Sequence, residues 1–135
     1  MKPTTLTTVL LVFAINGMGT YAYSQEFLDE FMTETTPEER AQFQTDYMKE
    51  SLSLKGDQET KVHDINVKYA EKMQEVYEAP TSDEQKVKSM KRINAEKEAE
   101  LKLILKPDQY SIYEKNKEAM KAKVKARIQE KEKGN

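Results

Sequence analysis

His63 is the only histidine of the chain, and there is no cysteine, so metal or nucleophilic chemistry would depend on one imidazole. A metal site needs three or four ligands in a fixed geometry, and only Asp64 and Glu59 stand close to His63 in sequence. No HExxH, Gly-x-Ser-x-Gly or Gly-rich phosphate loop accompanies it. We therefore expect no enzyme, no catalytic residue, no cofactor and no metal site. The alternatives for His63 are a weak metal site or, by default, a solvated helix face.

The absence of cysteine also excludes a disulfide framework and a lipid-anchored N-terminal cysteine. Hydrophobic residues make up 37% of the 135 residues and charged residues 34%. Such a chain has a thin core, which favours one domain and would be helped by dimerisation.

Residues 1–24 have the pattern of a signal peptide. Met1-Lys2 gives a positive start, Leu6 to Ile15 is mostly apolar, and Ala22-Tyr23-Ser24 offers small residues for a peptidase. We expect cleavage between Ser24 and Gln25, with cleavage after Ala22 or a retained membrane anchor as alternatives. No later segment approaches the roughly 20 apolar residues of a membrane span, so we expect a periplasmic protein without stable membrane insertion.

Proline and glycine divide the rest of the chain into helices. Thr36 to Glu39 reads as a capping box, and Ser82 with Gln85 reads as a second one. Apolar residues recur at helical spacing, and no segment alternates as a strand would. The apolar stripe is formed by Val62, Ile65, Tyr69 and Val76 in residues 57–78, and by Tyr113, Met120, Val124 and Ile128 in residues 107–131. The apolar stripes are narrow, and Lys97 interrupts one of them. We predict an all-α fold of elongated helical hairpins with about four helices, at 37–51, 57–78, 83–104 and 107–131.

A short acidic segment with two apolar pairs, Phe27-Leu28 and Phe31-Met32, precedes the first of these helices. It is interpreted as a short helix folded onto the body, with a mobile arm that contacts clients or a second subunit, and disorder, as alternatives. The predicted organisation is a signal peptide at 1–24, an N-terminal arm at 25–35, a helical domain at 36–131 and a tail at 132–135.

One phrase occurs twice, as LKGDQ at Leu54 to Gln58 and as LKPDQ at Leu105 to Gln109. In the second copy Lys106 can be the N-cap, with proline at the first helical position and Gln109 bonding back to the N-cap amide. Leu105 would then pack against Tyr110 as a hydrophobic staple. The first copy fits this pattern less well, and Val62 is the apolar contact expected for Leu54. Each copy therefore predicts a helix start.

This phrase resembles the LTxxQ motif of the Spy/CpxP-like family of periplasmic chaperones, with matches at Leu54, Gln58, Leu105 and Gln109. The resemblance runs from about Thr36 to Arg127. Both copies have lysine, Lys55 and Lys106, where the family has threonine, which removes a hydroxyl cap typically worth about 1 kcal/mol.

The resemblance implies an antiparallel homodimer shaped as a shallow cradle, which binds partly unfolded envelope proteins without ATP and limits their aggregation. Aromatic and methionine side chains adapt to varied partners. The candidates for client binding, each of which can instead be a core residue, are Tyr47, Met48, Ile65, Tyr69, Met73, Tyr77 and Met90. The alternatives are a regulatory partner of an envelope-stress sensor and, less favoured, a metal-responsive periplasmic protein.

Charge is distributed unevenly along the chain. Residues 25–85 carry 6 basic and 16 acidic side chains, whereas residues 86–135 carry 15 basic and 8 acidic ones. The two halves can dock between subunits or fold onto each other within one chain. The basic tail is interpreted as a solvated helix, with transient attraction to membrane phosphate as an alternative and nucleic acid not expected.

Overall fold

The computed structural model describes residues 11–12, 22–23 and 25–134 of the chain. Nearly all of this part is helical, which confirms the predicted fold class. Four long helices lie within two residues of their predicted bounds, and one short helix precedes them. The helices are α1 (Gln25–Glu34), α2 (Pro37–Leu52), α3 (Asp57–Glu78), α4 (Asp83–Ile104) and α5 (Pro107–Lys133).

Two strands of two residues each, β1 (Leu11–Val12) and β2 (Ala22–Tyr23), pair antiparallel ahead of the helices. Both fall within the predicted signal peptide, most of which, including most of the apolar stretch from Leu6 to Ile15, lies outside the described residues. Among the residues that the structure describes, no helix combines the length and hydrophobicity needed to cross a bilayer.

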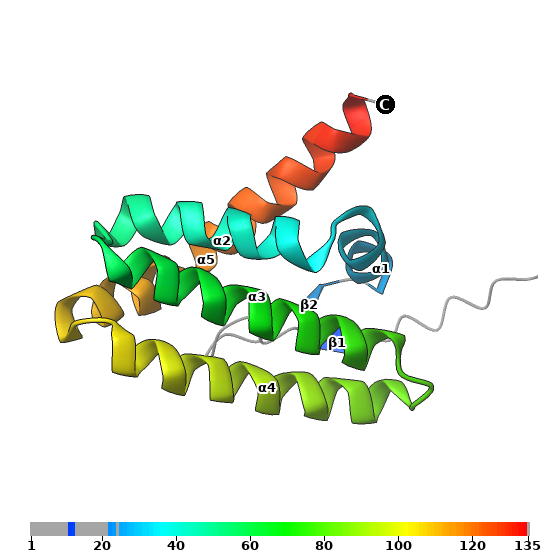
Figure 1. Cartoon of the computed structure of the whole chain (residues 1–135). Coiled ribbons are helices and arrows are strands. Elements are labelled where there is room, and N and C mark those ends of the chain that lie inside the picture. Colours follow the sequence, from blue (N-terminus) through cyan, green and yellow to red (C-terminus); the bar gives the residue numbers. More distant parts are fainter. Residues whose placement is uncertain (1–10, 13–21, 24, 135) are drawn as a thin grey trace, which may run out of the picture.

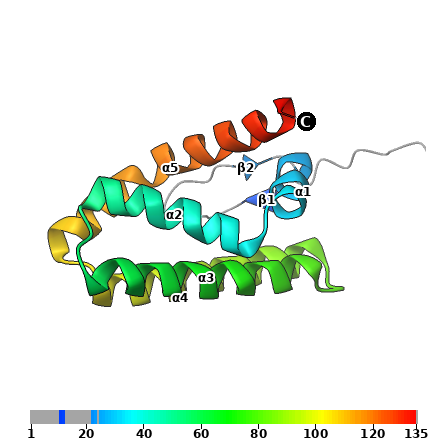
Figure 2. The same ribbon diagram turned by 45° about the horizontal axis from the view of Figure 1, so that its top comes forward.

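The long helices run back and forth as antiparallel neighbours. α2 packs on α3, and α3 packs along most of its length on α4 (Figure 1). α5 begins beside the end of α2 and runs back over it, and its C-terminal half diverges from α3 and α4 (Figures 1 and 2). The α2–α3 and α4–α5 connections, which contain the two copies of the repeated phrase, therefore lie at the same end of the molecule.

Side-chain caps fix the starts of α2 and α4. Thr36 Oγ1 accepts from Glu39 N at 3.1 Å, and Thr36 N donates to Glu39 Oε2 at 2.9 Å, so the predicted capping box of α2 is confirmed. Ser82 Oγ accepts from Gln85 N at 3.3 Å. Among the described residues the return bond from the Gln85 side chain is absent, so this predicted box is only half formed.

The core lies between α2, α3, α4 and the start of α5, and the apolar stripes predicted from the sequence supply most of it. Lys97, predicted to interrupt the stripe of α4, is itself buried, with 8% of its surface exposed. The side chains of Val124 and Ile128, expected on the stripe of α5, lie outside the described residues. The main core cluster contains Met48, Leu52, Leu54, Val62, Ile65, Tyr69, Ile93, Leu101, Leu105 and Tyr113.

α1 folds onto the body, as the first interpretation of the N-terminal segment predicted. Phe31 and Met32 are buried, and Tyr77 Oη donates to Asp29 Oδ1 at 2.7 Å. The Arg40 guanidinium lies 5.4 Å from the centre of the Phe31 ring. The side chains of Phe27 and Leu28 lie outside the described residues.

Candidate functional site

The two glutamines of the repeated phrase bond to each other. Gln58 Nε2 donates to Gln109 Oε1 at 2.5 Å, and Gln109 Nε2 donates to Gln58 Oε1 at 3.1 Å. Each amide also bonds to a helix-end carbonyl, Gln58 to Ile104 O at 3.3 Å and Gln109 to Leu52 O at 3.1 Å. The pair therefore ties the ends of α2 and α4 to the starts of α3 and α5.

The second copy caps its helix as predicted, whereas the first does not. Lys106 N donates to Gln109 Oε1 at 3.0 Å, which is the expected return bond of the box. In the first copy the N-cap is Gly56, with φ of 55°, which is one residue further along the phrase than the N-cap of the second copy. Gln58 therefore stands at the second position of α3, whereas Gln109 stands at the third position of α5. A positive φ suits glycine, which explains why the first copy has glycine where the second has proline.

The leucines of both copies point into the core. Leu54 and Leu105 are buried in one cluster with Val62, the apolar contact expected for Leu54. Tyr110, the expected staple partner of Leu105, packs against the same cluster. The sequence predicted these residues separately, but it gave no signal that the two copies would meet.

His63 belongs to a polar chain between α2 and α3. Thr45 Oγ1 donates to Ala41 O at 2.8 Å and accepts from Asn66 Nδ2 at 3.0 Å. Because the only hydroxyl proton of Thr45 is thus used, His63 Nδ1, 3.2 Å away, is the donor in that contact. Asn66 is fully buried, and its Oδ1 has no hydrogen-bond partner among the residues that the structure describes.

The default interpretation of His63 as part of a solvated face is therefore wrong, because the ring is half-buried and bonded to Thr45. Glu59, one of its possible co-ligands, pairs instead with Lys49 at 3.0 Å. Within the described part of the chain, no three His, Cys, Asp or Glu side chains come close enough together to hold a metal ion.

The seven candidates for client binding divide by burial. Four of them are buried within the single chain, which agrees with the alternative that they are core residues: Met48, Ile65, Tyr69 and Met90. Tyr47, Met73 and Tyr77 are half-buried. Among the described side chains, the large apolar ones that are exposed belong to Leu103, at 87%, and Ile112, at 40%. Neither residue was among the candidates.

Tyr69 is the most constrained of these candidates. Its hydroxyl donates to Glu100 Oε1 at 2.6 Å, and the ammonium groups of Lys68 and Lys72 lie about 5 Å from its ring centre. Burial, and then the bond to Glu100, raise the pKa of Tyr69. Hydrogen bonds from Lys68 and Tyr69 lower the pKa of Glu100. This arrangement holds α3 to α4.

Lys97 is a buried cation whose Nζ donates to Gln44 Oε1 at 2.6 Å. Burial lowers its pKa to about 8. It borders a small cavity of about 50 Å³ together with Met32, Tyr69 and Asn94. The sequence did contain a signal for this burial, because Lys97 stands on the apolar stripe of α4. We interpreted that position as an interruption of the stripe and not as a buried lysine.

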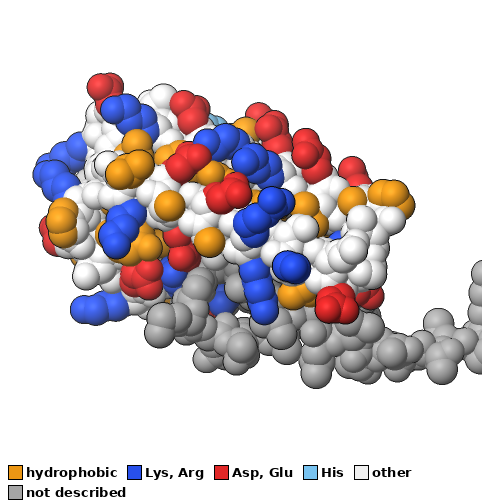
Figure 3. Space-filling model, turned by 90° about the horizontal axis from the view of Figure 1, so that it is seen from below, with side chains coloured by type: hydrophobic (Ala, Val, Ile, Leu, Met, Phe, Trp, Pro, Cys, Tyr) orange, Lys and Arg blue, Asp and Glu red, His pale blue; other side chains and the backbone are white. Residues whose placement is uncertain are grey.

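The acidic and basic halves of the chain touch within one subunit. Lys131 Nζ lies 2.9 Å from Glu39 Oε1 and so joins α5 to α2. Two further ion pairs, Lys68–Glu100 and Lys72–Glu96, also join the two halves. In these pairs the lysine comes from the acidic half and the glutamate from the basic half. On the side of α4, basic and acidic side chains alternate with scattered apolar ones (Figure 3). Docking of the halves between subunits stays a prediction.

The model of one family, the domain of unknown function DUF4890, matches residues 25–113. The match covers more than half of the chain, so the chain belongs to this family. It begins at Gln25, the first residue after the expected cleavage, and ends early in α5. No curated protein and no solved structure matches the chain.

Proposed function

We propose that the chain is an exported, ATP-independent chaperone that binds partly unfolded envelope proteins and limits their aggregation. The observation that carries the proposal is the reciprocal bond between Gln58 and Gln109. It supports the interpretation of the two phrases as one structural motif, and so the resemblance to the LTxxQ family of periplasmic chaperones.

The surface has features that suit weak and reversible capture. Leu103 and Ile112 are exposed large apolar side chains near the α4–α5 turn, and charged side chains surround them on both helices. Apolar contacts can hold an unfolded segment, while surrounding charges speed its encounter. Neither step uses a nucleotide.

The burial of four client-binding candidates favours the second candidate function, a regulatory partner of one envelope-stress sensor. A chain that uses Met48, Ile65, Tyr69 and Met90 in its own core offers less adaptable apolar surface to unrelated clients. A regulator needs one complementary surface only. In both functions the active form is proposed to be a homodimer.

The deciding experiment measures light scattering of two unrelated, chemically unfolded proteins with and without stoichiometric residues 25–135, in buffer free of nucleotide and metal. We expect suppression for both. Leu103→Ser should weaken suppression, because it removes an exposed large apolar side chain. Lys91→Ser, at an exposed position nearer the start of the same helix, is the control and should leave suppression unchanged.

Suppression for neither protein would contradict the chaperone function and leave the sensor-partner function. Equal suppression by Leu103→Ser and the parent protein would show that clients are held elsewhere. Addition of zinc or nickel tests the metal-responsive alternative, since a metal that binds the folded state raises its melting temperature. We expect no such rise.

A further inference from the structure

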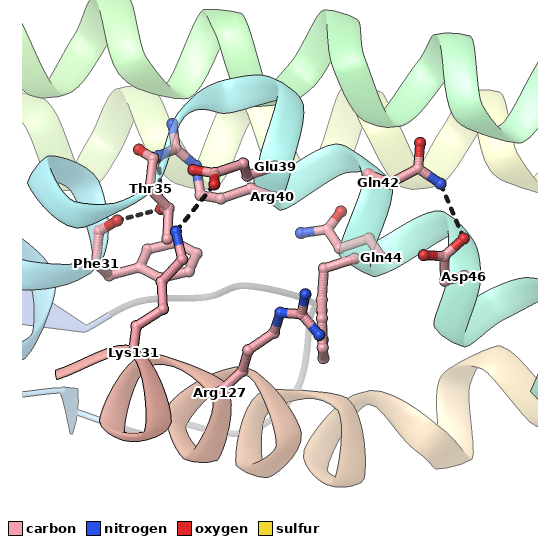
Figure 4. A pocket seen from close by; sticks show the side chains of 10 residues that line it. Phe31, Thr35, Glu39, Arg40, Gln42, Gln44, Asp46, Arg127 and Lys131 are labelled. Carbon is pink, nitrogen blue, oxygen red and sulfur yellow. Dashed lines mark hydrogen bonds and ion pairs between the residues drawn. The ribbon is translucent and has the colours of Figure 1, made fainter. Parts of the chain in front are cut away.

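A pocket of about 180 Å³ opens between α1, α2 and the distal half of α5. Phe31 and Phe43 supply apolar walls, and Arg127 and Lys131 reach toward α2 from the other side (Figure 4). This pocket is separate from the glutamine pair and from the exposed apolar residues of the α4–α5 turn. Its α5 side lies beyond the segment that matches the family model.

Two of the three cations that line the pocket are already engaged. Lys131 pairs with Glu39 at 2.9 Å. The Arg40 guanidinium donates to Thr35 O at 2.7 Å and to Gln74 Oε1 at 2.6 Å.

Arg127 is different. Its guanidinium lies 5.6 Å from the centre of the Phe43 ring, and among the described residues no hydrogen bond or ion pair uses its donors. The carboxylates that line the pocket are Glu39, which is paired with Lys131, and Asp46, which accepts from Gln42 Nε2 at 2.8 Å. With three cations and two carboxylates among the described residues, this lining has a net positive charge.

The chemistry of this lining defines a class of ligand. A guanidinium offers a planar fork of donors that matches a carboxylate, and its position over a ring keeps the fork oriented. A cavity of about 150 Å³ is large enough for benzene, so this pocket has room for one aromatic ring. We propose that the pocket binds a small aromatic carboxylate, with its ring against Phe31 and Phe43 and its carboxylate on Arg127.

The same chemistry occurs in a free aromatic acid and in the C-terminal phenylalanine of a peptide. The test is calorimetric titration of the full chain with phenylacetate in one arm and with Gly-Gly-Phe in the other. The neutral analogues, phenylacetamide and the amidated peptide, remove the charge but keep the ring. We expect each neutral analogue to bind at least tenfold more weakly than its acid.

Arg127→Gln should weaken binding of the acid at least tenfold and reduce the difference between acid and amide. Lys123→Gln is the matched control, because Lys123 lies on the same helix, over the Tyr47 ring, and outside the pocket. Phe43→Leu should weaken acid and amide alike. Circular dichroism melting of each variant checks that it folds.

Tight binding of Gly-Gly-Phe with weak binding of phenylacetate would support the site and identify peptide C-termini as its ligands, and the reverse result would identify free acids. Binding of neither acid, or equal binding by Arg127→Gln and the parent chain, would overturn the proposal. None of these outcomes depends on suppression of aggregation, so the chaperone function is tested separately.

Discussion

Gln58 and Gln109, 51 residues apart in sequence, form a reciprocal amide pair at the end of the molecule where both connections between helices lie. Gln109 is buried, and its amide also serves Lys106 N and Leu52 O. One side chain thus caps α5, satisfies a carbonyl at the end of α2 and holds the first copy of the phrase against the second.

Gln109→Ala should therefore lower the free energy of unfolding by about 2 to 4 kcal/mol, because it leaves Leu52 O and the Gln58 amide without their partner. Urea denaturation measures this change. Gln85→Ala, at the exposed start of α4, is the control and should change stability by less than about 0.5 kcal/mol.

A double-mutant cycle with Gln58→Ala isolates the pair itself. The two changes should be non-additive by about 1 to 2 kcal/mol, since either one alone breaks the same bonds. Simple additivity would show that the amide pair does not contribute to stability in solution.

The helices could be predicted from the sequence because the signals that define them are local. Thr36, Pro37 and Pro107 mark their helix starts through capping and a fixed φ, so the bounds followed within two residues. Periodicity also predicted Val62, Ile65 and Tyr69 among the buried residues of α3, but it gave no indication that Asn66 is buried beside them. The predicted start of α3 at Asp57 also agrees with the structure, although the positive φ of Gly56 makes the first copy of the phrase cap its helix differently from the second.

The candidate sites were harder to predict because they depend on which helices meet. The bond between His63 and Thr45, the pair of Gln58 and Gln109, and the pocket between Phe43 and Arg127 all join segments distant in sequence. A helix that packs into the core and a helix that binds a client also have the same apolar pattern in their sequences. That ambiguity explains why several candidates for client binding are core residues here.

Leu101 and Leu103 stand two residues apart on α4 and provide a direct test of its orientation. Leu101 is 0% exposed and Leu103 is 87% exposed. Leu101→Ala should cost about 2 to 5 kcal/mol, the usual range for an emptied core position, and Leu103→Ala less than about 0.5 kcal/mol. Thermal and urea denaturation of both variants measure the difference. Similar losses would mean that the exposed face of α4 is covered, as in a dimer.

Thr45 connects the buried amide of Asn66 to the ring of His63. Thr45→Val keeps the shape of the side chain but removes the oxygen that accepts from both, so it should cost about 1 to 3 kcal/mol. Thr45→Ser keeps the hydroxyl and should cost less than Thr45→Val. If the serine variant were the less stable of the two, packing of the methyl group rather than the polar chain would dominate at this position.

Lys97 should make stability depend on pH in the alkaline range. Its pKa is lowered from 10.5 to about 8 by burial, so between those values the unfolded chain binds more protons than the folded chain does. Stability from this group therefore rises with pH across that window, and the penalty for the buried charge is fully present below about pH 8.

Lys97→Met removes the penalty. The variant should gain stability relative to the parent chain at pH 7, and this advantage should shrink by about 3 kcal/mol as the pH rises to 10.5, at about 1.4 kcal/mol per unit of pKa shift. Measuring the difference between the two proteins cancels tyrosines such as Tyr69, whose raised pKa lowers stability at high pH in both. A difference that stays constant from pH 7 to 10.5 would mean that the Lys97 ammonium reaches water in the folded chain.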